Sequence, residues 1–143
     1  MAEGIEIQIE ELAGTLGQRT LALWACDCAE RILYLYEGVH PRDLRPRRAI
    51  DAGRDWVQGK MAVSQVRTRA FAAHAAARGA QDPAAGAAAR SAGHAAATAH
   101  VAGHALHAAS YAARAVAVAA EEKDAAATAL AERAWQYRHL LAL

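Results

Sequence analysis

Large side chains are scarce in this 143-residue chain, which has one phenylalanine, three tryptophans, four tyrosines and two methionines. Alanine supplies much of its 55% apolar fraction, and an alanine methyl buries little area, so helices must approach closely to form a core. A chain of this length fits one domain. We expect the few large residues to anchor the packing: Trp24, Ile32, Leu33, Leu35, Trp56, Phe71 and Trp135.

The chain also lacks a large excess of positive or negative charge, because 16 basic residues nearly balance 15 acidic ones, for a formal net charge of +1. Nucleic-acid-binding proteins usually show a strong basic excess, so no nucleic-acid partner is expected. No stretch of about 20 residues is apolar enough to span a bilayer. The first eleven residues contain four acidic residues and no basic one, whereas a secretory signal begins with basic residues. These absences predict a cytoplasmic protein with no membrane partner.

Only two cysteines are present, Cys26 and Cys28, and their CxC spacing differs from the CxxC of redox and zinc motifs. Residues two apart point to different sides of a helix, so a disulfide between them is geometrically poor. We expect both to be small buried apolar residues in a reducing compartment.

The N-terminal residues 1–14 are expected to form an arm or a short helix, because their apolar–polar alternation has no partner strand elsewhere. Residues 15–143 are expected to form a single helical domain. The apolar spacing predicts helices over 15–37, 43–60, 64–78 and 122–139.

The pattern that follows Asp82-Pro83, an N-cap and a first-turn proline, continues to Ala120 without another proline. One helix of that length would extend about 55 Å, too long for a domain of this size. We therefore predict a break near 98–103, and we predict Ser64 as the N-cap of the preceding helix. The expected fold is all-α, a compact bundle of five or six antiparallel, alanine-rich helices.

Histidines concentrate in one segment, with four of the seven between His94 and His107. On a continuous helix His100, His104 and His107 share one face, whereas His94 lies on a face that points to the core. His74 lies in the preceding helix.

The pair His100 and His104 has the spacing of a zinc-binding HExxH motif but lacks its glutamate. His107 is about 10 Å from His100 along a helix, so the three cannot easily bind one ion. We therefore assign no metal and no other cofactor, and keep a zinc or copper protein, with a third ligand from elsewhere in the chain, as a less favoured reading. The histidines remain candidates for acid–base chemistry, for a ligand cleft, or for ordinary hydrogen bonds within the helices.

Asp27 lies on a helix that is apolar around most of its girth, where an unpaired charge would be costly. It either assists a histidine or forms an ion pair with Arg31 or Arg54. No catalytic motif is present, so an enzyme is the less favoured reading and no catalytic residue is assigned. The candidate ligand- or partner-binding residues are His74, His94, His100, His104, Asp27, Arg54 and Trp56.

A basic segment follows the first long helix and contains Arg42, Arg45, Arg47 and Arg48. It is either a solvated loop whose arginines pair with nearby aspartates, or a docking patch for an acidic partner. Charge alone does not choose between the two.

Several stretches resemble one family: LALWACDCAERIL (21–33), RP with AIDA and RDW (45–56), RAFAAHAAAR (69–78), AGHAAATAHVAGHA (92–105) and YAARA (111–115). They are similar to putative immunity proteins with an Imm-5-like domain, and the likeness covers about residues 21–137. His94, His100 and His104 form its most specific part, and His107 lies outside it. The resemblance implies an all-helical bacterial protein that binds a cognate toxin of a polymorphic toxin system and blocks it.

The leading hypothesis is therefore an immunity-type protein that neutralises a toxin by protein–protein binding. The alternative is a small-molecule-binding protein, or a small helical enzyme of specialised metabolism or self-resistance, with a histidine-lined cleft. The oligomeric state is left open.

Overall fold

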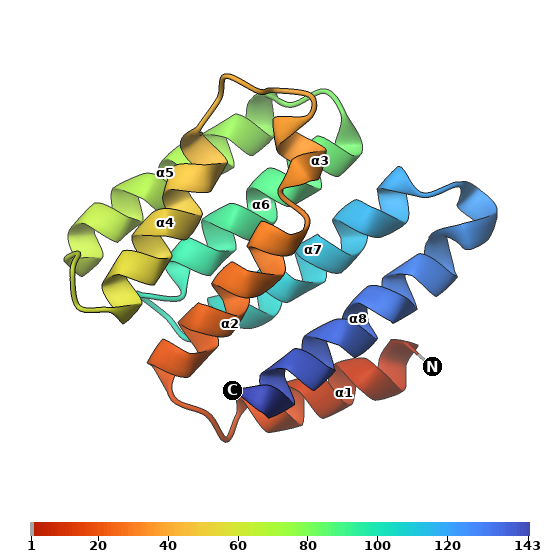
Figure 1. The fold of residues 1–143 in the computed structure, drawn as a ribbon, viewed down its shortest axis with the longest axis horizontal. Coiled ribbons are helices and arrows are strands. Elements are labelled where there is room, and N and C mark those ends of the chain that lie inside the picture. Colours follow the sequence, from red (N-terminus) through yellow and green to blue (C-terminus); the bar gives the residue numbers. More distant parts are fainter. Residues whose placement is uncertain (1) are drawn as a thin grey trace.

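The computed structural model describes residues 2–143 and the side chains of residues 4–143 as helices joined by short connections (Figure 1). In chain order the elements are α1 (Ala2–Ala13), α2 (Gln18–Arg31), α3 (Tyr34–Glu37), α4 (Arg45–Val57), α5 (Val63–Gly79), α6 (Pro83–Ala97), α7 (His104–Ala119), the 3-10 turn η1 (Glu122–Asp124) and α8 (Ala125–Ala142). The described residues contain no strand, so the all-α class is confirmed. None of these helices is both long and apolar enough to cross a membrane.

The number of helices was predicted too low. The described part of the chain holds seven helices of twelve residues or more, besides the four-residue α3. One reason is that the N-terminal segment forms the complete helix α1, which packs against α8.

A second difference lies in the helix expected over 15–37, which is interrupted after Arg31. The amides of Ile32 and Leu33 donate to the carbonyls of Ala29 and Glu30, so α2 ends in a tight 3-10 turn before α3. Neither proline nor glycine marks this point, so the sequence carries no signal for it.

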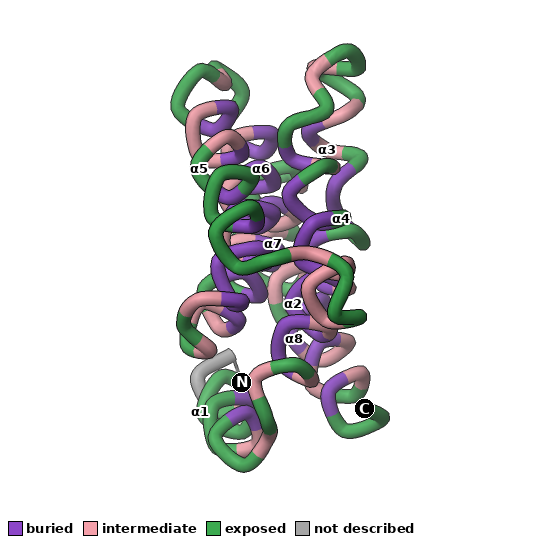
Figure 2. Tube along the Cα trace, turned by 90° about the vertical axis from the view of Figure 1, so that its left-hand side faces the viewer, coloured by how far each residue is buried: buried purple, intermediate pink, exposed green. Residues whose placement is uncertain are grey.

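Two layers of helices form the body of the molecule (Figure 2). One contains α5, α6 and α7, and the other contains α2, α3 and α4. Helix α6 is central, because it packs against α2, α4, α5 and α7. Most of its residues are buried, and nearly all of these are alanines. Small side chains let the neighbouring helices approach closely, as the composition predicts.

The expected large anchors are only partly confirmed. Trp24, Ile32 and Leu33 are fully buried, whereas Trp56 and Trp135 are half-buried against the core. Leu35 is half-buried as well. The prediction for Phe71 was wrong, since 65% of its surface is exposed. Alanine-lined helices close the core at α5 without it, so the phenylalanine is left outside.

The predicted break between α6 and α7 is confirmed, since α6 ends at Ala97 and α7 begins at His104. The Thr98 hydroxyl donates to the His94 carbonyl at 3.0 Å. From α2, the Gln18 side-chain amide donates to the carbonyls of Thr98 (2.9 Å) and Ala99 (3.1 Å). These bonds satisfy carbonyls at the end of α6 and hold the turn that brings α7 back along α6.

Helix starts follow the expected chemistry at one position and not at another. Asp82 caps α6, its carboxylate accepting from the Ala85 amide at 2.9 Å. The prediction for Ser64 was wrong, because α5 begins one residue earlier. Ala62 occupies the N-cap position, and its amide donates to the Gln65 side chain at 3.4 Å.

Candidate functional site

Four histidines from three helices meet at the outer side of α6. His74 comes from α5, His94 from α6, and His104 and His107 from α7. The His74 ring meets the His94 ring edge-on, with centroids 4.8 Å apart. The His94 and His104 rings are stacked at 5.2 Å, and their Nδ1 atoms are 3.0 Å apart. The turn after α6 produces this cluster, since it places His104 opposite His94.

Two further residues belong to the cluster. The His94 ring lies 5.2 Å from that of His107 and 5.4 Å from that of Tyr111, with which it is nearly parallel. The placement of His94 on a core-facing side was therefore wrong, and His107, which was not among the candidate residues, lies beside it. The placement assumed a continuous helix, whereas the turn reverses the chain. The sequence did contain a signal for the contact between His94 and His104. The two are equally distant from Ala99, which lies inside the predicted break, so a reversal of the chain there brings them together.

The position of His74 depends on a glycine. A Cβ atom on Gly93 would lie 2.7 Å from two atoms of the His74 ring, so the ring rests directly on the α6 backbone. The Arg90 guanidinium is 3.0 Å from His74 Nδ1. Arginine can only donate, so this nitrogen accepts, and the proton of the neutral ring lies on Nε2.

Three histidines of the cluster, His74, His94 and His104, have lowered pKa values and are unprotonated at neutral pH. Burial, and to a smaller extent positive charge on His74, His104, His107 and Arg90, lowers the pKa of His94 to about 4. Burial lowers the pKa of His74 and His104 in the same direction. Unprotonated imidazoles offer both a hydrogen-bond donor and an acceptor, so the cluster is suited to recognise neutral or anionic polar groups.

A cleft of about 280 Å³ opens beside these rings. Its lining is largely apolar and comprises Arg67, Ala70, Phe71, His74, Ala97, His100, Val101 and His104. Of the four predicted histidines, His74, His100 and His104 line this cleft. The fourth, His94, contacts the rings of His74 and His104.

His100 has unused hydrogen-bonding capacity. Its Nδ1 is 3.2 Å from the Ala97 carbonyl, which can only accept, so the proton lies on Nδ1. Its Nε2 is then a buried acceptor, and it has no partner among the described residues. Among all the described residues, no group of three or more His, Cys, Asp or Glu side chains is arranged to hold a metal ion.

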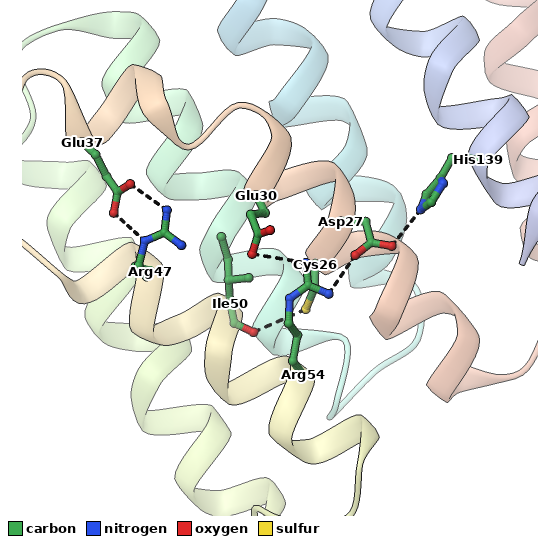
Figure 3. A network of polar contacts seen from close by, with 8 residues as sticks. All are labelled: Cys26, Asp27, Glu30, Glu37, Arg47, Ile50, Arg54 and His139. Atoms are coloured by element: carbon green, nitrogen blue, oxygen red, sulfur yellow. Dashed lines mark hydrogen bonds and ion pairs between the residues drawn. The ribbon is translucent and has the colours of Figure 1, made fainter.

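Asp27 and Arg54 lie elsewhere, in a polar network between α2, α4 and α8 (Figure 3). One Asp27 oxygen accepts from Arg54 Nη1 and the other lies 2.7 Å from His139 Nε2. Arg54 reaches Glu30 as well, at 3.3 Å. Of the two ion-pair partners expected for Asp27, the structure selects Arg54. His139 was missed, because nothing in the sequence indicates that α8 lies beside α2.

This network borders a second cleft of about 280 Å³, lined by Asp27, Glu30, Arg31, Arg54, Trp135 and His139. The Trp135 and His139 rings are stacked at 4.7 Å, and the Arg31 guanidinium lies over Trp135 at 4.3 Å. Arg31 also binds Glu132 at 2.9 Å. The adjacent Cys26 is buried, which raises its pKa to about 12, so it is not a reactive thiolate.

Trp56 joins neither cleft. Its ring lies under the Arg19 guanidinium at 4.8 Å, and the same guanidinium donates to the Trp56 carbonyl at 2.8 Å. Arg19 also donates to the Val57 carbonyl, at the last residue of α4. The seven predicted site residues therefore occupy three separate places.

The basic segment between α3 and α4 is partly neutralised. Arg45 pairs with Asp43 at 2.8 Å, and Arg47 pairs with Glu37 at 2.7 Å (Figure 3). Arg42 and Arg48 are exposed and have no carboxylate partner among the described residues. Asp43 also accepts from the Tyr36 hydroxyl. The predicted pairing with aspartates thus holds for Arg45 alone, since the partner of Arg47 is a glutamate.

Comparison with known proteins gives one match. The sequence model of the family described as Imm-5 like putative immunity protein matches residues 11–143. Comparisons with curated proteins and with solved structures found no match.

Proposed function

Because the chain belongs to the Imm-5 like putative immunity protein family, we propose that it neutralises a cognate toxin in the cytoplasm by binding to it. The observation that carries this proposal is the extent of the family match, which includes every element from α2 to α8. The resemblance noted in the sequence points to the same partner.

The chemistry of the described residues supports binding rather than catalysis. Both cysteines are buried and their pKa values are raised, so neither is a ready nucleophile. Asp27 is held by Arg54, which leaves it poorly placed to act as a base. The described surface measures 7268 Å², so a standard interface of about 800 Å² per partner would cover roughly a tenth of it.

A direct test is to express the toxin encoded beside this chain with and without the chain. We expect the toxin alone to stop growth, co-expression to restore it, and the two proteins to co-purify in a fixed ratio. A chain that neither restores growth nor binds the purified toxin would contradict the proposal. A toxin inactivated at its own active site should still bind, which separates binding from removal of the toxin by other means.

A small molecule is the second candidate ligand, and the observation that favours it is the unpartnered His100 Nε2 beside the histidine-lined cleft. Native mass spectrometry of protein purified gently from its own cytosol tests this. A small adduct that disappears in His100→Ala and His104→Ala would support a ligand. His107→Ala is the matched control, because His107 is a neighbouring histidine that does not line the cleft. An adduct that survives all three changes would place the ligand elsewhere.

A further inference from the structure

The small net charge of the chain hides an uneven distribution. Helices α5, α6 and α7 carry Arg67, Arg69, Arg78, Arg90 and Arg114, whereas the only acidic residue from Val63 to Ala119 is Asp82. Asp82 caps the first turn of α6. None of these five arginines has a carboxylate within 4.0 Å among the described residues. One layer of the molecule is therefore basic, and the rest of the chain contains more acidic than basic residues.

Three of these arginines line two hollows on this layer, Arg67 the cleft beside the histidines and Arg90 and Arg114 a second hollow. We name the two hollows together the α5–α7 groove. Helix α6 lies between α5 and α7 (Figure 1), and residues of all three helices line the hollows. The α6 residues along the groove are Pro83, Ala87, Arg90, His94 and Ala97, whose spacing of three and four places them on one face of the helix. The second hollow has a volume of about 250 Å³.

The two outer helices carry matching stripes. On α5, Arg67, Phe71, His74 and Arg78 are spaced by four, three and four residues. On α7, His104, His107, Tyr111, Arg114 and Val118 are spaced by three, four, three and four. Arg90, Tyr111, Arg114 and Val118 line the second hollow.

Apolar side chains stand exposed at one end of this groove. Phe71 is 65% exposed and Val101 is 59% exposed, and both line the cleft beside His100. Phe71 is the only phenylalanine of the chain, and it contributes little to the core. Exposed aromatic residues flanked by arginines are the composition that dominates binding energy at protein–protein interfaces.

We propose that the α5–α7 groove is the surface that docks the toxin, and that the toxin presents an acidic face with an apolar side chain at its centre. The apolar side chain enters the cleft between Phe71 and Val101. Carboxylates around it pair with Arg67, Arg90 and Arg114. The choice of an acidic partner rests on charge complementarity, because Asp82 is the one acidic residue among those lining the groove, and it caps α6 and pairs with none of these arginines. The inference rests on the proposed function.

A protein fits this groove better than a nucleic acid does. A duplex presents a continuous row of phosphates, which would pair with the arginines but would leave Phe71 and Val101 uncovered. An acidic protein surface supplies both carboxylates and apolar side chains. The pKa values of His74, His94 and His104 are lowered, so these rings add hydrogen bonds rather than further positive charge.

The test measures binding of the purified toxin encoded beside this chain at about 0.15 M salt. Two groove variants are used, Phe71→Ala and the double variant Arg67→Glu with Arg114→Glu. The matched control is Arg42→Glu with Arg48→Glu, which makes the same change in net charge in the other exposed basic segment. All these side chains are exposed, and circular dichroism verifies that each variant is folded.

We expect Phe71→Ala to weaken binding at least about fivefold and the charge-reversed groove variant at least about tenfold, mainly through slower association. The control should stay within about threefold of the wild type. Groove variants that bind as tightly as the wild type would overturn the inference alone, and loss of binding only in the control would place docking at the basic segment. A wild-type chain that does not bind the toxin would overturn the proposed function and this inference with it. Binding of a short duplex DNA at the same salt, as tight as that of the toxin, would overturn the choice of a protein partner.

Discussion

The Nδ1 atoms of His94 and His104 lie 3.0 Å apart, although ten residues and a turn separate them in the chain. At this distance one nitrogen donates and the other accepts, so the two rings share one proton between these atoms. Protonating both would place two N–H groups against each other. The contact therefore links the geometry of the α6–α7 turn to the protonation of the cluster.

Stability should fall as the pH is lowered from about 6.5 to about 4. The pKa of His94 is about 4 in the folded chain and near 6.5 when unfolded, so in this range the unfolded chain binds the additional proton. Across that range we expect the free energy of unfolding of His94→Gln to fall by roughly 2 kcal/mol less than that of the wild type. This figure is reduced to allow for the partial solvent exposure of His94. Urea unfolding at several pH values measures the difference. Between pH 7 and 8 the difference in free energy of unfolding between the two proteins should be constant. If the stability of both proteins declines equally at low pH, the lowered pKa of His94 is contradicted.

Two glycines should respond to alanine in opposite ways. A Cβ on Gly53 would lie 2.7 Å from the sulfur of buried Cys26, so Gly53→Ala should destabilise the fold by about 1–3 kcal/mol. At Gly86 the nearest atom would be 3.7 Å away, an ordinary contact. Gly86→Ala should therefore be neutral or stabilise by up to about 1 kcal/mol, because alanine favours a helix. Thermal unfolding of both variants checks the prediction, which fails if they shift in the same direction.

Neutralising Asp27 should destabilise the contact between α2, α4 and α8. Asp27→Asn removes the charge that binds both Arg54 and His139, and we expect a loss of about 1–3 kcal/mol. Glu121→Gln is the control, because Glu121 and its partner Lys123 are each 77% exposed and such pairs contribute little. Equal unfolding midpoints for the wild type and Asp27→Asn would show that the network does not stabilise the fold.

Gln18 should matter for the histidine cluster although it touches none of its rings. Gln18→Ala leaves two carbonyls at the end of α6 without their donor, and we expect a loss of about 1–2 kcal/mol. The ring signals of His94 and His104 in NMR spectra should shift, since the turn positions both rings. Gln8→Ala, an exposed change on α1, should leave these signals unchanged. Unshifted ring signals in Gln18→Ala would disprove the link between turn and cluster.

The sequence was most informative where local chemistry decides the structure. Asp82-Pro83 marks the start of α6, and the limit on helix length places the turn before His104. The end of α2 at Arg31 could not be predicted, because tertiary packing rather than a helix-breaking residue determines it. Phe71 was assigned to the core on the assumption that large apolar residues are buried.

Pairings across helices depend on the rotation of each helix, and an alanine-rich sequence specifies this rotation weakly. The sequence grouped His74, His94, His100 and His104 around one cleft. All but His94 line the same cleft, and His94 contacts two of them. The other candidates, Asp27, Arg54 and Trp56, lie elsewhere. The grouping of Asp27 with His139 could not be predicted, because 112 residues separate them and no pattern connects α2 with α8.

The alanines of α6 have a consequence for how this chain changes in evolution. An alanine side chain has no rotamers, so the interior cannot rearrange to absorb a larger residue or to fill a gap. We therefore expect substitutions at the buried face of α6 to destabilise the fold almost regardless of their chemistry. A substitution on the outer stripes of α5 and α7 requires no interior repacking, so it changes the binding surface without disturbing the fold. Such a scaffold confines sequence drift to its exterior, where new specificities can arise while the fold remains the same.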